Sequence, residues 1–478
     1  MDLTLSPWAM AHIVIFLLGF LNAGFAISYV RSPQGAVAWA ACLLIIPHLA
    51  LPLYWIFGPR RFYFYKRKLS QAFQEFQDKS RDEQSQSLYH SATQLPEKYR
   101  DDQRFFEAIA ESKFTRGNSV QVYSTGKSYF ASVLEEIERA KHYIFLQYYI
   151  VRSDTLGKEF LHKLANKTAQ GVKVYLLYDQ IGSFALSSRF TNSLREHGIQ
   201  LAVFKTNRGV RNPFLLNFRN HRKIVVCDGK VGFIGGSNLG LEYREKTKRF
   251  NVWRDTDIRI SGPALHGIQR AFLRDWYWAT DQHIQGTSWN FEEQEQNLTS
   301  LSIHTGPSSK QDEATLLFMN LFTMAERRIW VATPYLVPDE GIVTALQLAA
   351  LRGLDVRILL PAIWDHPLVS LATAYYARQI SHAGVKVYRY KPGFMHQKVA
   401  LIDDQFSLIG TKNLDNRSLQ LNFEISLLTY SESLASQVEK VLEVDFGHSC
   451  LLDDEYFASE SQLFVLITRF ARLFSPVL

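Results

Sequence analysis

The sequence repeats one alternating pattern of strands and helices, and this repeat constrains the fold more than any other feature. The first copy runs through residues 143–204 and the second through residues 328–390. In each copy short apolar runs alternate with longer helical stretches, which predicts parallel strands joined by crossover helices. Matching glycines, Gly171 and Gly353, lie 182 positions apart. We therefore expect an α/β protein with two like halves related by a pseudo-twofold axis.

Each half carries the same polar residues after its repeated strands. The segments NHRKIVVCDGKVGFIGGSN and MHQKVALIDDQFSLIGTKN both read His-x-Lys-x4-Asp-x6-Gly-x-x-Asn. Because side chains two apart on a strand project from one face, His and Lys should lie together. Asp-Gly or Asp-Asp between apolar runs predicts a tight turn and a returning strand, which brings Asn back towards them. The aligned positions are His221, Lys223, Asp228, Gly235 and Asn238, and His396, Lys398, Asp403, Gly410 and Asn413.

These side chains suit chemistry at a phosphodiester. Two lysines and two amides offer positive charge and hydrogen bonds to phosphate oxygens and to a pentacoordinate transition state. Two histidines allow one to attack phosphorus while the other moves a proton. No carboxylate cluster suitable for magnesium is evident, so we expect neither a metal nor a cofactor. The inference is phosphoryl transfer through a phosphohistidine, and the near-equivalent motifs leave open which histidine attacks.

The N-terminal region is apolar and separate. Residues 8–30 and 36–57 hold no formal charge, and each is long enough to cross a hydrocarbon core of roughly 30 Å as a helix. A cleaved signal peptide would need a basic segment before the first run, which is missing. We expect a transmembrane hairpin whose second helix is kinked by Pro47 and Pro52. Basic residues without an acid follow the second span, which places the chain beyond residue 58 in the cytoplasm. These residues are Arg60, Arg61, Lys66, Arg67 and Lys68.

The patterns divide the chain into four parts. We expect a hairpin over 1–58, a basic juxtamembrane connector over 59–103, a first half over 104–290 and a second half over 291–478. The hydrophobic fraction of 47% and the aromatic fraction of 13% exclude a disordered chain. Three cysteines outside any disulfide or zinc spacing exclude a disulfide framework. The net charge of +7 suits an anionic partner but does not choose between phospholipid and nucleic acid.

The paired pattern resembles the HKD motif of the phospholipase D superfamily. The segments LPLYWIFGPRRF, WRDTDIRISGPAL, GTKNLDNRSLQLNFEI and RLFSPVL extend the resemblance to bacterial cardiolipin synthases over essentially the whole chain. The resemblance implies two αβα sandwich halves packed face to face, with the His, Lys and Asp of each motif as the catalytic set. It also implies His221 as the nucleophile and His396 as the general acid and base.

The same resemblance implies a membrane enzyme of the bacterial inner membrane that converts two phosphatidylglycerol molecules to cardiolipin and glycerol, with no nucleic acid as partner. A phospholipase D-type hydrolase of lipid or nucleic acid and a non-catalytic lipid-binding protein remain alternatives. The residues also leave open phosphatidylethanolamine as the donor, the acyl-chain preference and the oligomeric state, a homo-oligomer included.

In superfamily members a later carboxylate holds the catalytic imidazole in its tautomer. Aligning WRD with NFE puts Asp255 and Glu424 at this position, 34 and 28 residues after the histidine of the same half. Such acids make chemical sense because an imidazole nucleophile needs its second nitrogen fixed. Although Asp228 and Asp403 define the motif, we expect them to act structurally at the turn.

The position after the motif glycine differs between the halves. It is Gly236 in the first half and Thr411 in the second, so only Thr411 is expected to add a hydroxyl bond to phosphate. Asn238 and Asn413 are the other predicted phosphate-binding residues. The two halves should therefore not be chemically identical.

The first half also contains an extra basic segment, KTNRGVRNPFLLNFRNHR. We expect PFLLNF to dip into the bilayer while the arginines hold lipid phosphates, with a solvated basic loop as the alternative. The C-terminal SQLFVLITRFARLFSPVL is expected to be a packed terminal helix, with an interfacial helix as the alternative. The candidate lipid contacts are Arg208, Arg211, Phe214, Leu215, Leu216 and Phe218.

Overall fold

The computed structural model separates the chain into two compact units. The N-terminal unit comprises residues 1–74 and 206–216, and the main unit comprises residues 75–205 and 217–478. The structure describes residues 6–30, 33–58, 67–78, 91–205, 218–247, 251–307 and 312–478.

The first predicted span is a single helix, whereas the second is divided. Helix α1 (Pro7–Tyr29) is the one helix in the described part of the chain long and apolar enough to cross a membrane. The second span forms α2 (Pro33–Ile45) and α3 (Pro47–Phe57), broken at Ile46, whose φ of −129° and ψ of 56° are not helical. Pro47 explains the break because its ring disfavours helical geometry at the preceding residue. Pro52, also expected to kink the helix, lies inside α3. A further helix covers residues 67–78.

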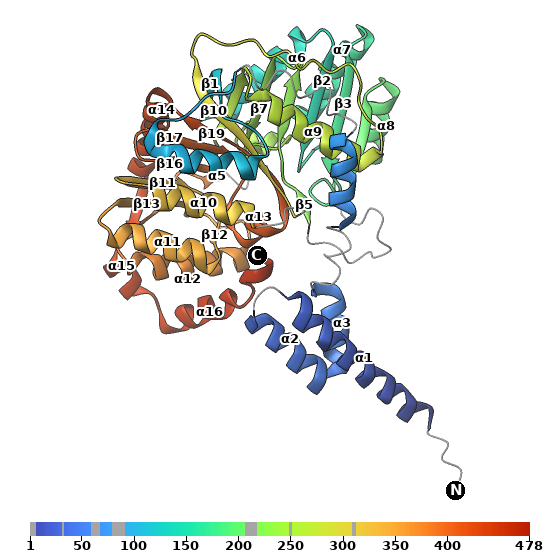
Figure 1. The fold of residues 1–478 in the computed structure, drawn as a ribbon, viewed down its shortest axis with the longest axis vertical. Coiled ribbons are helices and arrows are strands. Elements are labelled where there is room, and N and C mark those ends of the chain that lie inside the picture. The colour runs from blue at the N-terminus through green and yellow to red at the C-terminus, as the bar shows by residue number, and fades with distance from the viewer. Residues whose placement is uncertain are drawn as a thin grey trace. The chain divides into compact units, whose positions relative to one another are not determined.

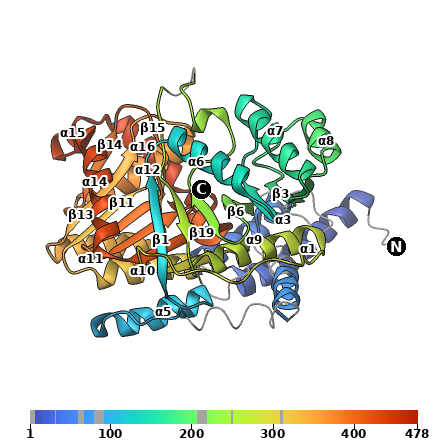
Figure 2. The same cartoon turned by 90° about the horizontal axis from the view of Figure 1, so that it is seen from above.

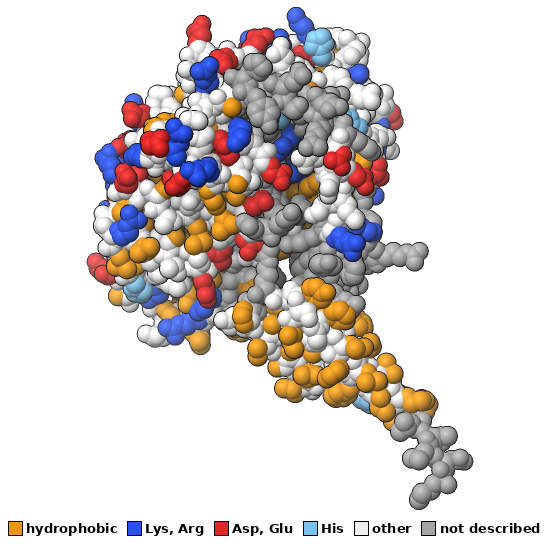
Figure 3. Space-filling view, in the orientation of Figure 1, with side chains coloured by type: hydrophobic (Ala, Val, Ile, Leu, Met, Phe, Trp, Pro, Cys, Tyr) orange, Lys and Arg blue, Asp and Glu red, His pale blue; other side chains and the backbone are white. Residues whose placement is uncertain are grey.

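Small side chains bring the helices of the N-terminal unit together. A Cβ atom at Gly19 would lie 2.4 Å from the carbonyl oxygen of Leu43, so only glycine allows this approach of α1 to α2. Trp55 on α3 donates its indole N–H to Asn22 on α1 at 3.3 Å. The outer surface is almost wholly hydrophobic (Figure 3). Small residues inside and large apolar residues outside are typical of helices that pack in lipid.

The main unit contains the two predicted halves (Figure 1). The first half begins with β1 and ends with α9, and its strands β2, β3 and β4 coincide with the first copy of the repeat. The elements of the first half are β1 (Thr115–Tyr123), α6 (Gly126–Arg139), β2 (Tyr143–Tyr148), α7 (Thr155–Ala169), β3 (Lys173–Asp179), α8 (Ser188–Glu196), β4 (Gln200–Phe204), β5 (Arg219–Asn220), β6 (Ile224–Cys227), β7 (Val231–Gly235), η2 (Leu241–Tyr243), β8 (Trp253–Arg254), β9 (Asp257–Ser261) and α9 (Leu265–Thr280).

The second half repeats this order, with β11, β13 and β14 in the places of β2, β3 and β4. Its elements are β10 (Leu298–Thr305), α10 (Glu313–Met324), β11 (Arg328–Ala332), β12 (Leu336–Val337), α11 (Glu340–Leu351), β13 (Asp355–Pro361), α12 (Pro367–Ser381), β14 (Lys386–Tyr390), β15 (Phe394–Met395), β16 (Val399–Ile402), β17 (Phe406–Gly410), β18 (Leu414–Asp415), α13 (Asn416–Gln420), β19 (Asn422–Tyr430), α14 (Glu432–Gly447), β20 (Ser449–Leu452), α15 (Asp454–Ser459), α16 (Gln462–Arg472) and η3 (Ser475–Val477).

One sheet runs through both halves. Strands β2, β3 and β4 pair in parallel, as do β11, β13 and β14, which agrees with the predicted crossover connections. The halves are joined edge to edge where β1 pairs antiparallel with β10, near the middle of Figure 2. The expected face-to-face packing therefore describes only part of the contact between the halves. The main path of the sheet is β20-β14-β13-β11-β16-β17-β19-β10-β1-β9-β7-β6-β2-β3-β4.

A helix that precedes the first half packs against the second. Helices η1 (Glu97–Tyr99) and α5 (Arg100–Ala110) lie in a segment that the sequence divides between the connector and the first half. In the structure Tyr99 and Phe106 belong to the same buried cluster as Leu301 and Phe318. The core of the second half is therefore completed by residues from before the first.

The predicted HKD hairpins are present as β6–β7 and β16–β17, and an aspartate forms each turn. Asp228 and Asp403 have φ values of 53° and 51°. The carboxylate of Asp228 accepts the backbone N–H groups of Lys141, His142 and Tyr143 at 2.7–2.8 Å. Asp403 does the same for residues 326–328. Each aspartate thus ties its hairpin to the start of the neighbouring strand.

We expect Asp228→Ala to destabilise the main unit. Three backbone donors lose a charged acceptor, which should cost about 3 kcal/mol and lower the thermal midpoint by roughly 3–4 °C. Differential scanning fluorimetry in detergent measures this shift. Asp101→Ala is the matched control, because Asp101 is exposed and makes only a surface ion pair with Arg104. Equal midpoints for the two variants would contradict the structural role of Asp228.

Candidate active site

The two HKD hairpins bring their histidines to one cavity. His221 and His396 are both buried, and both line a cavity of about 740 Å³ in the main unit. Asn238 and Asn413 line the same cavity. The residues that the sequence predicts to act on a single phosphate are therefore gathered from the two halves.

Each imidazole is paired with a carboxylate of the other half. His221 Nδ1 lies 3.1 Å from Glu424 Oε2, and His396 Nδ1 lies 2.7 Å from Asp255 Oδ2. The two acids are the predicted ones, but the expected pairing of each with the histidine of its own half is wrong. The pairing is crossed, so neither half contains a complete histidine–carboxylate pair.

Short stretches of backbone pairing cause this crossing. Strand β5 pairs in parallel with β19, and the N–H of His221 donates to the carbonyl oxygen of Phe423 at 2.9 Å. Strand β15 pairs with β8 in the same way, and the N–H of His396 donates to the carbonyl oxygen of Arg254 at 2.7 Å. Each histidine therefore lies beside the segment of the opposite half that carries its acid, with Glu424 within β19 and Asp255 directly after β8.

The carboxylates determine the state of the imidazoles. A carboxylate only accepts hydrogen bonds, so each Nδ1 carries the hydrogen and each Nε2 keeps its lone pair. Burial lowers the pKa of His221, and burial together with the charge of Lys398 lowers the pKa of His396 to about 3. Both rings are thus neutral at pH 7, the form in which an imidazole acts as a nucleophile or base.

The acids remain charged despite their burial. Burial by itself raises the pKa of Glu424, but the opposing effects of His221 and Lys223 lower that pKa to about 2. The pKa of Asp255 is likewise lowered, because Lys398 and His396 outweigh the effect of burial. Two carboxylates and two lysines thus form a buried cluster in which each charge is stabilised by its neighbours.

The motif lysines lie beside the histidines. Lys223 Nζ donates to the carbonyl oxygen of His221 at 2.7 Å, and Lys398 Nζ likewise donates to the carbonyl oxygen of His396. Burial lowers the pKa of Lys223 to about 7 and the pKa of Lys398 to about 8. Both ammonium groups therefore titrate close to neutral pH in the free enzyme, and an anionic phosphodiester would favour their charged forms.

The motif asparagines retain donors for a ligand. Asn238 Nδ2 donates to the hydroxyl of Tyr243 at 2.8 Å, and Asn413 Nδ2 donates to Asp415 Oδ2 at 2.9 Å. An amide nitrogen carries two hydrogens, so each asparagine can donate a second hydrogen bond to phosphate. This geometry is compatible with the phosphate-binding role predicted for both residues.

Thr411 has a different role from the one predicted. Its hydroxyl donates to Glu424 Oε2 at 2.5 Å and accepts the N–H of Ile425 at 3.0 Å. The hydroxyl is therefore used to hold the acid rather than a phosphate. At the matching position in the first half, a Cβ atom on Gly236 would lie 2.0 Å from Asp255 Oδ1, so the glycine leaves room for that acid.

Three further predictions need correction or fall outside the described residues. Asp228 and Asp403, which the resemblance groups with the catalytic residues, lie at the hairpin turns at the opposite end of β6 and β16 from the histidines, where the turn chemistry led us to expect a structural role. Phe218, a predicted lipid contact, is fully buried. The other predicted lipid contacts lie outside the described residues: Arg208, Arg211, Phe214, Leu215 and Leu216.

Sequence reasoning missed two buried aspartates that hold the HKD segments. Asp275 on α9 accepts two hydrogen bonds from Arg222 at 2.7 Å, and Asp445 on α14 accepts one from Gln397 at 2.8 Å. Arg222 and Gln397 stand between the His and Lys of their motifs. Asp445 also binds Arg254 at 2.7 Å. A signal was present, because α9 and α14 each carry an aspartate directly before an aromatic residue, in RDWYW and EVDFG.

A family comparison decides the identity of this site. The family model described as "Cardiolipin synthase, PLD-like domain" matches residues 133–276 and 318–446, more than half of the chain. The chain belongs to this family. Both matched segments include an HKD hairpin, so the family pattern covers the histidines of both halves.

Relatives with this family name match nearly the full chain. Cardiolipin synthase A of Pseudomonas putida (strain F1) is 41% identical over 480 residues, covering 99% of each chain. Cardiolipin synthase A of Pseudomonas aeruginosa (strain LESB58) is 39% identical, covering 97% of this chain and 95% of the relative. The crystal structure of phosphatidylserine synthase from Haemophilus influenzae has a TM-score of 0.60 at 16% identity, covering 78% of this chain and 99% of that one. That structure shows the shared fold, and the relatives together with α1 indicate a bacterial membrane protein.

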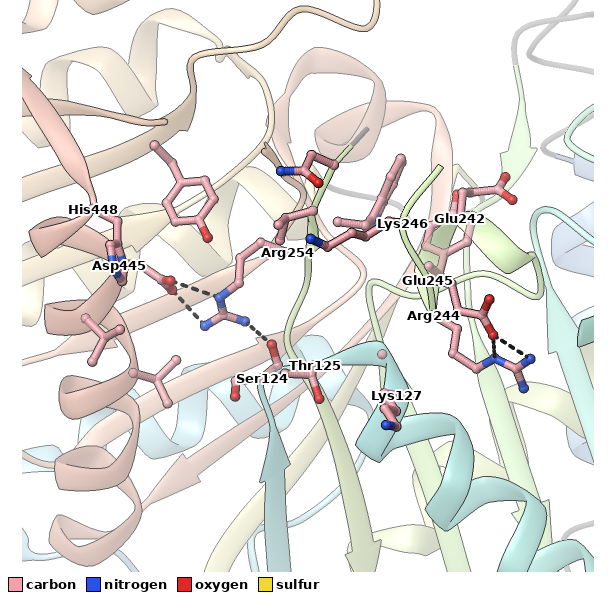
Figure 4. Close-up of a pocket in the computed structure, with 18 of the residues that line it drawn as sticks. Ser124, Thr125, Lys127, Glu242, Arg244, Glu245, Lys246, Arg254, Asp445 and His448 are labelled. Atoms are coloured by element: carbon pink, nitrogen blue, oxygen red, sulfur yellow. Dashed lines mark hydrogen bonds and ion pairs between the residues drawn. The ribbon is translucent and has the colours of Figure 1, made fainter. Parts of the chain in front are cut away.

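In this member of the cardiolipin synthase family a second cavity lies beside the first. It measures about 620 Å³ and shares Glu242, Tyr243 and Trp253 with the wall of the histidine cavity. Figure 4 shows Arg254 in this cavity, held between Asp445 and the carbonyl oxygen of Ser124. The ring of Trp253 lies 5.2 Å from the ring of His396, so this residue separates the two cavities. Among the described residues, no group of three or more His, Cys, Asp or Glu side chains is placed to hold a metal ion.

The crossed pairing predicts distinct effects for the two acids. With a phosphatidyl ester of p-nitrophenol, whose leaving group needs no proton, the expected nucleophile His221 depends on Glu424 for its orientation. Glu424→Gln should then slow formation of the covalent intermediate by about 10²-fold or more, because the imidazole loses its orienting charge. Asp255→Asn should leave that step nearly unchanged and slow the following transfer. Release of p-nitrophenol in rapid-mixing experiments measures the first step. The opposite pattern would make His396, oriented by Asp255, the nucleophile.

The lysines predict a pH dependence. Because the pKa values of Lys223 and Lys398 are lowered to about 7 and about 8, both lose their charge as the pH rises through this range. We expect kcat/KM for an anionic phospholipid to fall between pH 7 and pH 9, mainly through a higher KM. Steady-state kinetics in mixed micelles from pH 6 to pH 9.5 test this expectation. A kcat/KM that rises over the alkaline range would contradict it.

Proposed function

We propose that the chain synthesises cardiolipin by transferring a phosphatidyl group from one phosphatidylglycerol to another. The observation that carries this proposal is the pair of neutral histidines, one from each half, which line one cavity together with two asparagines. A motif lysine is buried beside each histidine. Family membership supports a phosphatidyltransferase of phospholipid biosynthesis. The substrates would be anionic phospholipids, both as donor and as acceptor.

In the first step His221 acts as the nucleophile. Its Nε2 attacks the phosphorus of the donor, a P–N bond forms, and the P–O bond to glycerol breaks. His396 donates its Nε2 proton to the glycerol oxygen that leaves. A phosphodiester anion in the cavity would raise the pKa of His396 and so allow it to carry this proton. The lysines and asparagines stabilise the negative charge on the phosphate oxygens.

In the second step the headgroup hydroxyl of another phosphatidylglycerol replaces the histidine. His396, now neutral, takes the hydroxyl proton while the oxygen attacks phosphorus. The P–N bond breaks, and cardiolipin and free His221 result. Transfer to lipid instead of water is favoured where the lipid hydroxyl is held next to the intermediate at a high effective concentration.

The proposed location is the bacterial inner membrane, with more than one crossing and the catalytic unit in the cytoplasm. Helix α1 supports one crossing, and α2 with α3 together cover the second predicted span. The orientation rests on the basic residues after the second span in the sequence.

Purified full-length protein with radiolabelled phosphatidylglycerol tests this function. We expect cardiolipin and glycerol on thin-layer chromatography. His221→Ala should abolish the covalent adduct, His396→Ala should allow some adduct to form but stall its transfer, and His382→Ala, at an exposed position, should behave as wild type.

The alternatives give different products. Phosphatidate as the main product would indicate a hydrolase, and an unchanged lipid would indicate a binding protein. Equal adduct levels in wild type and His221→Ala would overturn the choice of nucleophile.

A further inference from the structure

Exposed hydrophobic side chains lie in two segments that contribute residues to the lining of the histidine cavity. Phe184, in the connection from β3 to α8, is 83% exposed and lines this cavity. The equivalent connection of the second half, from β13 to α12, carries Trp364, which is 40% exposed, next to cavity-lining Asp365. The two halves therefore present hydrophobic groups at matching places beside one cavity. We define the apolar rim as Phe184, Ile363, Trp364 and Leu368.

Helix α16 buries small side chains and exposes its large hydrophobic ones, whereas most helices of soluble proteins do the opposite. Its buried positions are Thr468 and Ala471, whereas its large hydrophobic side chains point away from the core. The expected packed terminal helix is thus present, but it packs through its small residues. We define the α16 stripe as the side chains that are 41–70% exposed along this helix and just after it: Leu463, Leu466, Ile467, Phe470, Leu473 and Phe474.

The apolar rim and the α16 stripe border the same helix. Helix α12 begins at Pro367, between the rim residues Trp364 and Leu368. Helix α16 packs along α12 (Figures 1 and 2). Arg472 donates to the hydroxyl of Tyr375 on α12 at 2.8 Å, and the hydroxyl of Tyr376 donates to Ser475 at 3.1 Å. These bonds hold α16 and the following η3 against α12, the helix whose first turn carries Leu368 of the rim.

The charge of α16 complements an anionic surface. The helix carries Arg469 and Arg472 and no acidic residue. Figure 3 shows hydrophobic and basic side chains together at the edge of the main unit where α16 runs. An apolar face with adjacent arginines is typical of helices that lie in the interface of an anionic bilayer. Exposed hydrophobic groups on this scale mark an interaction site.

We propose that the apolar rim and the α16 stripe form a docking surface for a bilayer that contains anionic phospholipid. The surface holds the cavity mouth against the lipid headgroups, so a phosphodiester reaches the histidines while its acyl chains stay in the membrane. A membrane-spanning helix tethers a protein but does not determine which face of it meets the lipid. This inference rests on the proposed function, because a lipid substrate gives the docking its purpose.

Fluorescence quenching by lipid tests the surface in the full-length protein. A bimane label is placed at Phe184→Cys or Phe470→Cys after Cys42 and Cys450 are changed to Ser, while the buried Cys227 is left in place. His162→Cys on α7, at the opposite edge of the main unit in Figure 1, is the matched control. The protein is reconstituted in phosphatidylglycerol-containing nanodiscs with or without a lipid that carries a doxyl group high on its acyl chain.

We expect the doxyl lipid to reduce emission at least twofold at Phe184→Cys and Phe470→Cys and to leave His162→Cys unchanged. Equal quenching at all three sites would overturn the proposal. A change in bimane emission at Phe470→Cys that depends on the protein concentration and not on the doxyl lipid would also overturn the proposal. In that case a second copy of the chain would cover the α16 stripe.

Kinetics provide a second test. The double variant Leu466→Glu/Phe470→Glu changes only exposed side chains, so its thermal midpoint should match wild type. We expect its KM for long-chain phosphatidylglycerol in vesicles to rise at least fivefold, with kcat/KM for a soluble short-chain phosphatidylglycerol unchanged. An unchanged KM in vesicles would contradict the proposal. Quenching in a protein that makes no cardiolipin would refute the proposed function and leave the docking surface in place.

Discussion

The crossed pairing of imidazoles and carboxylates is the interaction on which the site depends. His221 is oriented by Glu424, and His396 by Asp255, so each half supplies a histidine to the cavity and an acid to the other half's histidine. A separated half would have neither an oriented imidazole nor a neutralised acid. The active site therefore depends on the strand pairings that join the two halves. These are the edge-to-edge pairing of β1 with β10 and the short pairings of β5 with β19 and of β15 with β8.

Burial of these charges explains both their reactivity and their arrangement. A buried ammonium or carboxylate is costly unless an opposite charge or a hydrogen bond accompanies it. Lys223 and Lys398 have lowered pKa values because that compensation is incomplete, and a phosphodiester anion would complete it. The two lysines would thus both bind the phosphodiester and stabilise the negative charge on its oxygens. The neutral histidines follow from the same burial.

The two halves hold their histidines and acids in place with different residues. In the second half Thr411 donates a hydrogen bond to Glu424, whereas in the first half Gly236 leaves space for Asp255. Arg222 and Gln397 likewise occupy matching positions and bind matching aspartates. These differences make the environments of the two histidines unequal, which is compatible with one acting as nucleophile and the other as acid and base. A lipid substrate adds a further constraint: moving two acyl chains of about 16 carbons into water would cost on the order of 20 kcal/mol, so the headgroup must be reached at the membrane.

The sequence by itself determined the repeat, the parallel strands, the two HKD hairpins and the first apolar helix, because these depend on local periodicity and turn chemistry. The resemblance to the phospholipase D superfamily also pointed to Asp255 and Glu424 as the acids. Only the tertiary structure decided which acid serves which histidine, because that depends on which strand of one half lies beside the other half. For the same reason only the packed structure showed the outward face of α16 and the roles of Thr411, Asp275 and Asp445. The spacing of residues along a chain indicates whether a segment is a helix or a strand, but it does not indicate which element packs against that segment.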